Sequence, residues 1–147
     1  MTMTTTTDHV EHLDEAECWH RLLGAQVGRL AFDGRHAVSI VPLNYVVRGH
    51  SLLFRTVSDA DLLTPQRRPV AFEIDGWSSR TAWSVVAQGD LNPDPDPDVL
   101  AREAEIGLAP WAPDDRGPRS TVVELVVRTV SGRSFPRHPR SDVPWYW

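Results

Sequence analysis

An arginine and a threonine at the end of one predicted strand are the residues of this chain best suited to hold a phosphate. Arg55 and Thr56 close the segment 42–56, which has the pattern of two strands joined by a turn at residues 48–50. A guanidinium presents a charged fork to an oxyanion, and hydroxyl and backbone N–H groups can complete the shell around it. The pattern therefore predicts a hairpin that ends on a phosphate clamp.

Two carboxylates follow this pair and act against an anion. Asp59 and Asp61 come three and five residues after Thr56. At about 6 Å and an effective dielectric constant near 20, one unit charge changes the interaction energy by roughly 3 kcal/mol before screening. The same carboxylates are suited to act as acids or bases, or to contact a cationic ligand. The clamp is therefore expected to be altered at this point.

All fifteen basic residues of the chain are arginine. Without lysine, the protein has no Schiff-base or lysine-nucleophile chemistry and no P-loop, and any anion site must use arginine, hydroxyls or backbone amides. Arg67 and Arg68 follow the two aspartates and are able to swing in as substitute cations. Exclusive use of arginine is typical of GC-rich genomes, among them those of actinobacteria.

The composition indicates one acidic domain that binds neither nucleic acid nor a membrane. The chain has 147 residues, 41% of them hydrophobic, and a net charge of −5. Nucleic acids and anionic membranes select basic surfaces, and no apolar run approaches the roughly 18 residues of a membrane span. The N-terminal residues lack the hydrophobic core of a signal peptide, and a single cysteine suits a reducing compartment. We therefore expect a cytoplasmic protein.

The elements that must position these side chains are mostly strands. Asp14 and Glu17 form a capping box for one short amphipathic helix, which Gly24 is expected to end in a left-handed cap. β-Branched and aromatic residues between turn signals predict six strands, at residues 27–32, 37–47, 51–56, 69–75, 81–91 and 121–130. One helical turn at residues 59–64 and a short helix at residues 99–107 complete the pattern.

Six short strands with few helices predict a mainly β protein, a small antiparallel barrel. Residues 1–12 are expected to be a disordered tail, 13–135 the barrel domain, and 136–147 an aromatic C-terminal tail that ends in Trp145, Tyr146 and Trp147. This tail is either disordered or packed across a dimer interface or the ligand groove. So small a barrel has no room for a large cavity, so a sizeable ligand must bind at the rim or between two subunits.

Seven segments in their order along the chain resemble the FMN-binding split barrels of the pyridoxamine 5'-phosphate oxidase-like family, in its flavin-reductase and nitroimidazole-resistance-like branch. The segments are residues 17–23, 27–31, 42–45, 54–56, 70–75, 83–85 and 131–133. The resemblance implies a homodimer with FMN in a groove at the interface and a small organic molecule as the substrate of an oxidoreductase.

The resemblance also implies which residues contact the cofactor. The flavin ring would lie along Pro42, Leu43, Asn44 and Tyr45. Arg55 and Thr56 would hold the phosphate, with Trp83 and Ser84 nearby. No residue is assigned a catalytic role.

One departure from the family pattern leaves two alternatives open. The family usually has glycine and lysine where this chain has Asp59 and Asp61. A deazaflavin such as F420, with its different phosphodiester tail, would suit an altered clamp. A cofactor-free homologue, repurposed as a small-molecule binder or a non-redox enzyme of secondary metabolism, would need no clamp.

Metal and thiol chemistry find no support in the sequence. His9, His12, Cys18 and His20 are close together, but their spacing matches no zinc template, so no metal site is predicted. Cys18 stands in a position next to the helix start that predicts burial, which disfavours a role as nucleophile.

Overall fold

The computed structural model describes residues 9–57, 62, 67–99 and 120–137 of the chain. Within these residues the elements follow in the order β1 (Glu11–Leu13), α1 (Glu15–Gly24), β2 (Val27–Asp33), β3 (Val38–Arg48), β4 (Ser51–Val57), β5 (Arg68–Trp77), β6 (Thr81–Asn92) and β7 (Ser120–Pro136), and residues 97–99 are also helical. The mainly β, antiparallel fold predicted from the sequence is confirmed.

One antiparallel sheet contains all seven strands and closes on itself. Its order is β1-β7-β4-β3-β2-β5-β6, and a further pairing of β6 with β7 joins the ends. Closure satisfies the backbone groups of strands that would otherwise be exposed edges. The sequence predicts only β2 to β7, because the three residues of β1 are too few for an alternating pattern. Glu11 and His12, expected in the N-terminal tail, belong to β1.

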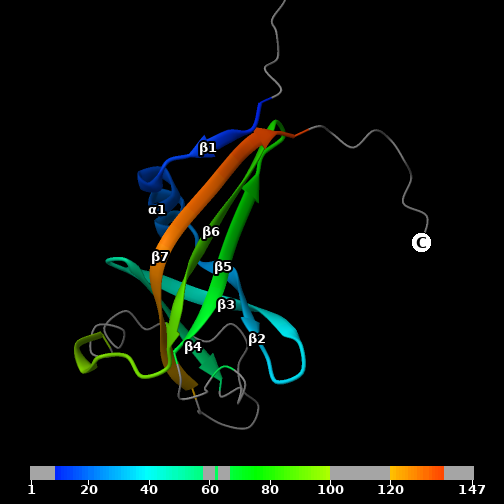
Figure 1. Cartoon of the computed structure of the whole chain (residues 1–147). Helices are drawn as coiled ribbons and strands as arrows, with labels where there is room; N and C mark the ends of the chain where they lie inside the picture. Colours follow the sequence, from blue (N-terminus) through cyan, green and yellow to red (C-terminus); the bar gives the residue numbers. More distant parts are fainter. Residues whose placement is uncertain (1–8, 58–61, 63–66, 100–119, 138–147) are drawn as a thin grey trace, which may run out of the picture.

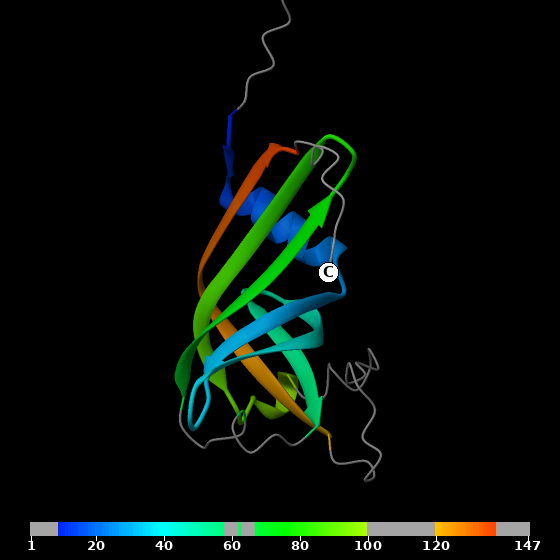
Figure 2. The same cartoon turned by 90° about the vertical axis from the view of Figure 1, so that its right-hand side faces the viewer.

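The strands β5, β6 and β7 extend beyond the barrel as a long ribbon (Figures 1 and 2). β6 pairs with β7 from Thr81↔Pro136 to Asn92↔Glu124, whereas β4 pairs with β7 only as far as Val126. The helix α1 lies along one side of the ribbon, and β1 pairs with the edge of β7 at its far end. β7 therefore continues to Pro136, well past residue 130, where the sequence predicts its end.

An aromatic cluster fills the barrel. Phe72 packs edge-on against Tyr45 with ring centroids 4.9 Å apart, and it also contacts Phe54 at 5.1 Å. Phe54 and Phe72 are fully buried, and burying one such side chain contributes about 1.5–3 kcal/mol. Gly28 leaves room for this cluster, since an added Cβ would lie 2.2 Å from the Phe72 ring.

The start of α1 follows the prediction and its end does not. The Asp14 carboxylate accepts a hydrogen bond of 2.8 Å from the Glu17 N–H, as an N-cap residue should. Gly24 remains helical, and the extended Ala25 follows it, so the expected left-handed cap is wrong. Among the described residues, only Gly49 has a positive φ, of 56°, in the predicted β3–β4 turn.

Several expectations fall largely outside the described residues. The helical turn at 59–64 is represented by Leu62 alone, and most of the predicted helix at 99–107 is also outside. Of the expected C-terminal tail, the structure describes only residues 136 and 137. Within the described part of the chain, no helix has the length and apolarity needed to cross a membrane.

The bulge between β6 and β7 is expected to tolerate no side chain at Gly89. An added Cβ would lie 1.9 Å from the Val126 carbonyl oxygen, which is backbone and cannot rotate away. We expect Gly89→Ala to lower the free energy of unfolding by about 3 kcal/mol or more. The matched control Gly24→Ala meets no atom within 4 Å at a helical position, and should raise it by about 0.5–1 kcal/mol. Urea unfolding measures both, and equal midpoints for Gly89→Ala and wild type would contradict the prediction.

Candidate functional site

The β3–β4 hairpin brings the predicted clamp residues to one end of the barrel. Tyr45 pairs with Phe54, and both side chains point into the core. Because side chains alternate between the two faces of a strand, Asn44 and Arg55, one step beyond this pair, emerge together on the outer face. Thr56 follows, paired with Thr121 of β7 and only 5% exposed. Asn44 and Arg55 therefore share the outer face, whereas the Thr56 side chain alternates to the inner face and is buried.

The same alternation divides the four residues expected along the flavin ring. Leu43 and Tyr45 are buried, and the Tyr45 hydroxyl donates a hydrogen bond to the Leu22 carbonyl oxygen. Burial raises the pKa of the Tyr45 phenol, so it stays protonated at neutral pH. Pro42 is exposed and Asn44 half-buried. A ligand on the outer face can touch Leu43 and Tyr45 only through their backbone.

Trp83 and Ser84 lie on opposite faces of the ribbon. The Trp83 ring faces α1, where the Arg21 guanidinium stands 4.6 Å from its centroid, and it packs on Gly76. Ser84 is on the outer face, in register with Asp75 and Arg133. Trp83 therefore stabilises the contact between helix and ribbon, and of the two only Ser84 is accessible to a ligand on the outer face.

The strand register also shows how far Ser84 lies from Asn44 and Arg55 within the chain. Pro42, Arg29, Glu73 and Val86 stand opposite one another across β3, β2, β5 and β6. Three strand spacings correspond to about 14 Å. Ser84, on β6, is therefore not brought next to Asn44 and Arg55 of the same chain.

A charged cluster lies between them on the outer face. Nη1 of Arg29 is 3.1 Å from Oδ1 of Asp75 and 3.4 Å from Oε2 of Glu73. Burial raises the pKa of the Glu73 carboxyl, the Asp75 charge adds to this, and Arg29 opposes it. The candidate site residues named from the sequence do not include Glu73 or Asp75. The alternation in Glu73-Ile74-Asp75 would have placed both carboxylates on one face.

Arg68, expected as a substitute cation, is the first residue of β5, and its side chain reaches the end of β2. Its guanidinium stands 5.3 Å from the Phe32 ring centroid, and Nη1 donates to the Asp33 carbonyl oxygen at 2.8 Å. Arg67 is exposed. Asp59 and Asp61 lie outside the described residues, so the predicted acidic alteration of the clamp stays a prediction.

A groove of about 590 Å³ runs over the outer face of β2, β5, β6 and β7. Two aliphatic side chains of β3 are exposed here: Val38, which lines the groove, is 74% exposed, and Ile40, next to the groove, is 67% exposed. The lining residues are Ala31, Phe32, Asp33, Val38, Pro69, Val70, Ala71, Gln88, Gly89, Arg128 and Thr129. Small residues and exposed aliphatic side chains give this face the character of a contact surface.

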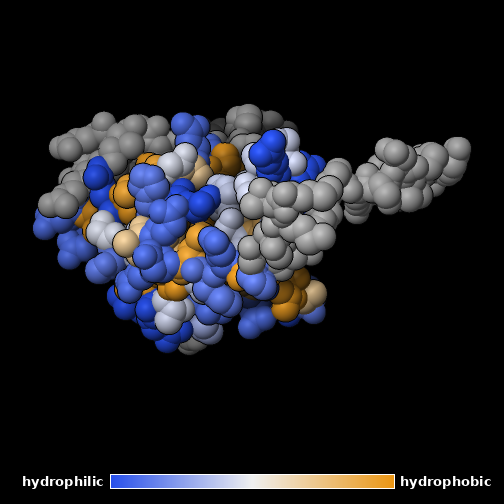
Figure 3. Space-filling model, turned by 90° about the horizontal axis from the view of Figure 1, so that it is seen from above, coloured by the Kyte–Doolittle hydropathy of each residue, from blue (hydrophilic) through white to orange (hydrophobic). Residues whose placement is uncertain are grey.

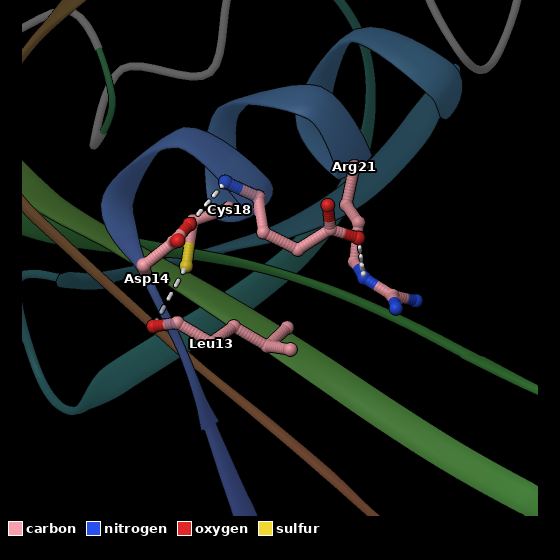
Figure 4. Close-up of polar contacts among 5 residues, drawn as sticks. Leu13, Asp14, Cys18 and Arg21 are labelled. Carbon is pink, nitrogen blue, oxygen red and sulfur yellow. Dashed lines mark hydrogen bonds and ion pairs between the residues drawn. The ribbon is translucent and has the colours of Figure 1, made fainter.

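Cys18 belongs to the core (Figure 4). Its side chain is fully buried, and the thiol donates to the Leu13 carbonyl oxygen at 3.9 Å. Burial raises the pKa of the thiol, and the nearby Asp14 carboxylate adds to the effect. The predicted burial is confirmed, and the protonated thiol is unsuited to act as a nucleophile.

Comparisons with known proteins agree with this architecture. The family model described as pyridoxamine 5'-phosphate oxidase matches residues 14–134. A candidate pyridoxamine 5'-phosphate oxidase from Corynebacterium glutamicum has a similar structure, with a TM-score of 0.75 and 27% identity over 88% of this chain and 100% of that one. The FAD binding protein from Mycobacterium smegmatis has a TM-score of 0.70 and 26% identity over 86% of this chain and 98% of its own.

A protein of unknown function from Corynebacterium diphtheriae is similar as well, with a TM-score of 0.69 and 28% identity over 86% of this chain and 98% of that one. No curated protein sequence matches. The family match spans most of the chain, the fold agrees over nearly the full length of these structures, and the resemblance seen in the sequence is confirmed. The chain belongs to the pyridoxamine 5'-phosphate oxidase family.

Proposed function

We propose that the protein is a flavin-dependent oxidoreductase that acts on a small organic molecule. The observation that carries this proposal is the placement of Asn44 and Arg55 together on the outer face at the end of the β3–β4 hairpin, within a family match over residues 14–134. The Mycobacterium smegmatis structure of a FAD binding protein, 26% identical, supports a flavin. We take FMN as the cofactor, and FAD shares its mononucleotide half.

The donors at this point suit the phosphate of a flavin mononucleotide. Arg55 supplies a charged fork and Asn44 an amide on the same outer face, whereas the Thr56 side chain is buried on the inner face. The backbone at residues 42–45 borders the outer face and would orient the ring. Bound flavin would supply the electron transfer, while the chain binds, orients and shields it.

A second copy of the chain is part of this proposal. Val38 and Ile40 present aliphatic side chains to solvent beside a groove lined largely by small and apolar residues. Pairing two such faces would remove this apolar surface from water and enclose a flavin bound at the hairpin end. The proposed protein is therefore a homodimer with the ligand in the groove between its subunits. We propose the cytoplasm as its location, because a single cysteine suits a reducing compartment.

Removal of the Arg55 guanidinium tests the clamp. We expect the purified full chain to bind FMN or FAD with quenching of flavin fluorescence. Arg55→Ala should weaken binding at least about tenfold, which corresponds to ~1.4 kcal/mol. Arg80→Ala, at the exposed β5–β6 turn, is the matched control and should leave affinity unchanged. Wild-type protein that neither carries flavin nor quenches it would contradict the proposal and favour a cofactor-free homologue.

Charge reversal at Asp61 tests whether the acidic segment opposes the flavin phosphate. Asp61→Lys should tighten FMN binding by about tenfold at low salt and by less at high salt, because salt screens the interaction between charges. Glu15→Lys makes the same change of charge at an exposed position on α1 and should have no effect. Fluorescence titration at two ionic strengths gives both affinities. An equal affinity for Asp61→Lys and wild type would mean that the phosphate binds elsewhere.

A matched pair of substitutions tests the proposed dimer face. Ile40 and Leu23 are both 67% exposed, but Ile40 lies beside the groove and Leu23 on α1. We expect Ile40→Lys to convert a dimer into a monomer and Leu23→Lys to leave it intact, because a buried charge without a partner is unfavourable. Sedimentation velocity measures the oligomeric state. A wild-type monomer, or a dimer that survives Ile40→Lys, would overturn this part of the proposal.

A further inference from the structure

A second group of anion-binding side chains lies on the ribbon, far from the hairpin. They border a recess of about 240 Å³ on the outer face, lined by His12, Ser84, Val86, Ser131, Gly132 and Arg133. Arg55 pairs with Val122 of β7, and Arg133 lies eleven residues further along that strand, at about 35 Å. One phosphate group cannot contact both arginines of a subunit.

Strand register brings the donors of this recess together. Arg133 of β7 pairs with His12 of β1 on one side and with Ser84 of β6 on the other. Ser131 precedes Arg133 by two residues and therefore lies on the same face. The row combines a guanidinium, an imidazole and two hydroxyls, all of which can donate hydrogen bonds to an oxyanion.

The electrostatic balance of the recess favours an anion. Within the described part of the chain Arg133 has no ion pair, whereas Arg21, Arg29 and Arg128 each contact a carboxylate. Two carboxylates are in register with the recess, Asp75 beside Ser84 and Glu73 beside Val86, and both contact Arg29, at 3.1 and 3.4 Å.

Glu11, next to His12, alternates to the opposite face. Hydrophilic residues predominate at this end of the molecule, with smaller hydrophobic areas among them (Figure 3). Among the residues that line the recess, Arg133 is therefore the charged one, and the carboxylates beside the lining already contact Arg29.

Exposed aromatic side chains stand next to this row. Trp77 pairs with Ala82 and Ala82 with Phe135, which forms the next row on the same face. Trp77 is 67% exposed and Phe135 38% exposed. Aromatic rings in such positions offer a flat apolar surface to a planar ligand.

We propose that this recess binds the oxyanion of a small planar molecule. Arg133 carries the main charge-assisted contact, with His12, Ser84 and Ser131 around it, and Phe135 and Trp77 contact the ring. The oxyanion is a phosphate or a carboxylate, borne either by the substrate or by the flavin itself. The site does not depend on the hairpin clamp, because Arg55 is too distant to contribute.

Phenyl phosphate, which combines a ring with an oxyanion, is the probe of this site. Calorimetry on the full chain should detect binding, and Arg133→Gln should weaken it about tenfold or more, because a charge-assisted contact is lost. Arg128→Gln removes a guanidinium on the same strand that Asp90 already engages, and should retain the wild-type affinity. Arg55→Ala should retain it as well.

Further measurements separate the site from its alternatives. Backbone amide shifts on addition of phenyl phosphate should centre on Ser84 and residues 131–133. If FMN displaces phenyl phosphate and riboflavin does not, the anion bound there is the flavin phosphate; if neither displaces it, the anion belongs to another molecule. Absence of binding to the wild type, equal binding to Arg133→Gln, or loss of binding in Arg55→Ala instead would each overturn the proposal.

Discussion

The pairing of β6 with β7 is the interaction on which the rest of the structure depends. It runs through twelve residue pairs and changes register once, at Gln88 and Gly89. There the backbone of Gly89 approaches the Val126 carbonyl so closely that a Cβ would lie 1.9 Å from its oxygen. The pairs on the Asn92 side of this bulge belong to the barrel, where β7 also pairs with β4. The pairs on the Thr81 side form the ribbon that carries α1 and β1. A bulge of this kind bends and twists the strand, as the change from barrel to ribbon requires.

Both candidate anion sites are held by β7, at opposite ends. Arg55 is positioned by the pairing of β4 with the start of β7, and Arg133 by the pairing of β1 and β6 with its end. In a chain with a net charge of −5, each site presents one arginine on the outer face. Each site also needs residues from more than one strand. The strand that closes the fold is also the one that assembles its polar chemistry.

Alternation along the strands separates stability from recognition. Leu43, Tyr45 and Phe72 point inward and form the core, while Pro42, Asn44 and Arg29 point outward. A sequence motif such as residues 42–45 therefore mixes two roles, and family resemblance alone does not tell them apart. The same holds for Trp83 and Ser84, of which the first supports α1 through Arg21 and the second borders the recess. The candidate sites therefore use the outer face and the backbone groups that reach it.

The sequence by itself determined what depends on neighbours along the chain. The Asp14 cap, the Gly49 turn, the burial of Cys18 and the positions of β2 to β6 all follow from local propensity and alternation. The order of seven short segments also identified the family. Of the candidate site, this order indicated the β3–β4 hairpin end, where Asn44 and Arg55 meet.

Only the tertiary structure decided which strands lie side by side and in what register. β1 exists because β7 offers it an edge, and β7 continues to Pro136 because β6 accompanies it. The ion pairs of Arg29 with Glu73 and Asp75 join residues more than forty positions apart, and His12 meets Arg133 across an even longer separation. Such contacts are set by the register of distant strands, which no local pattern encodes.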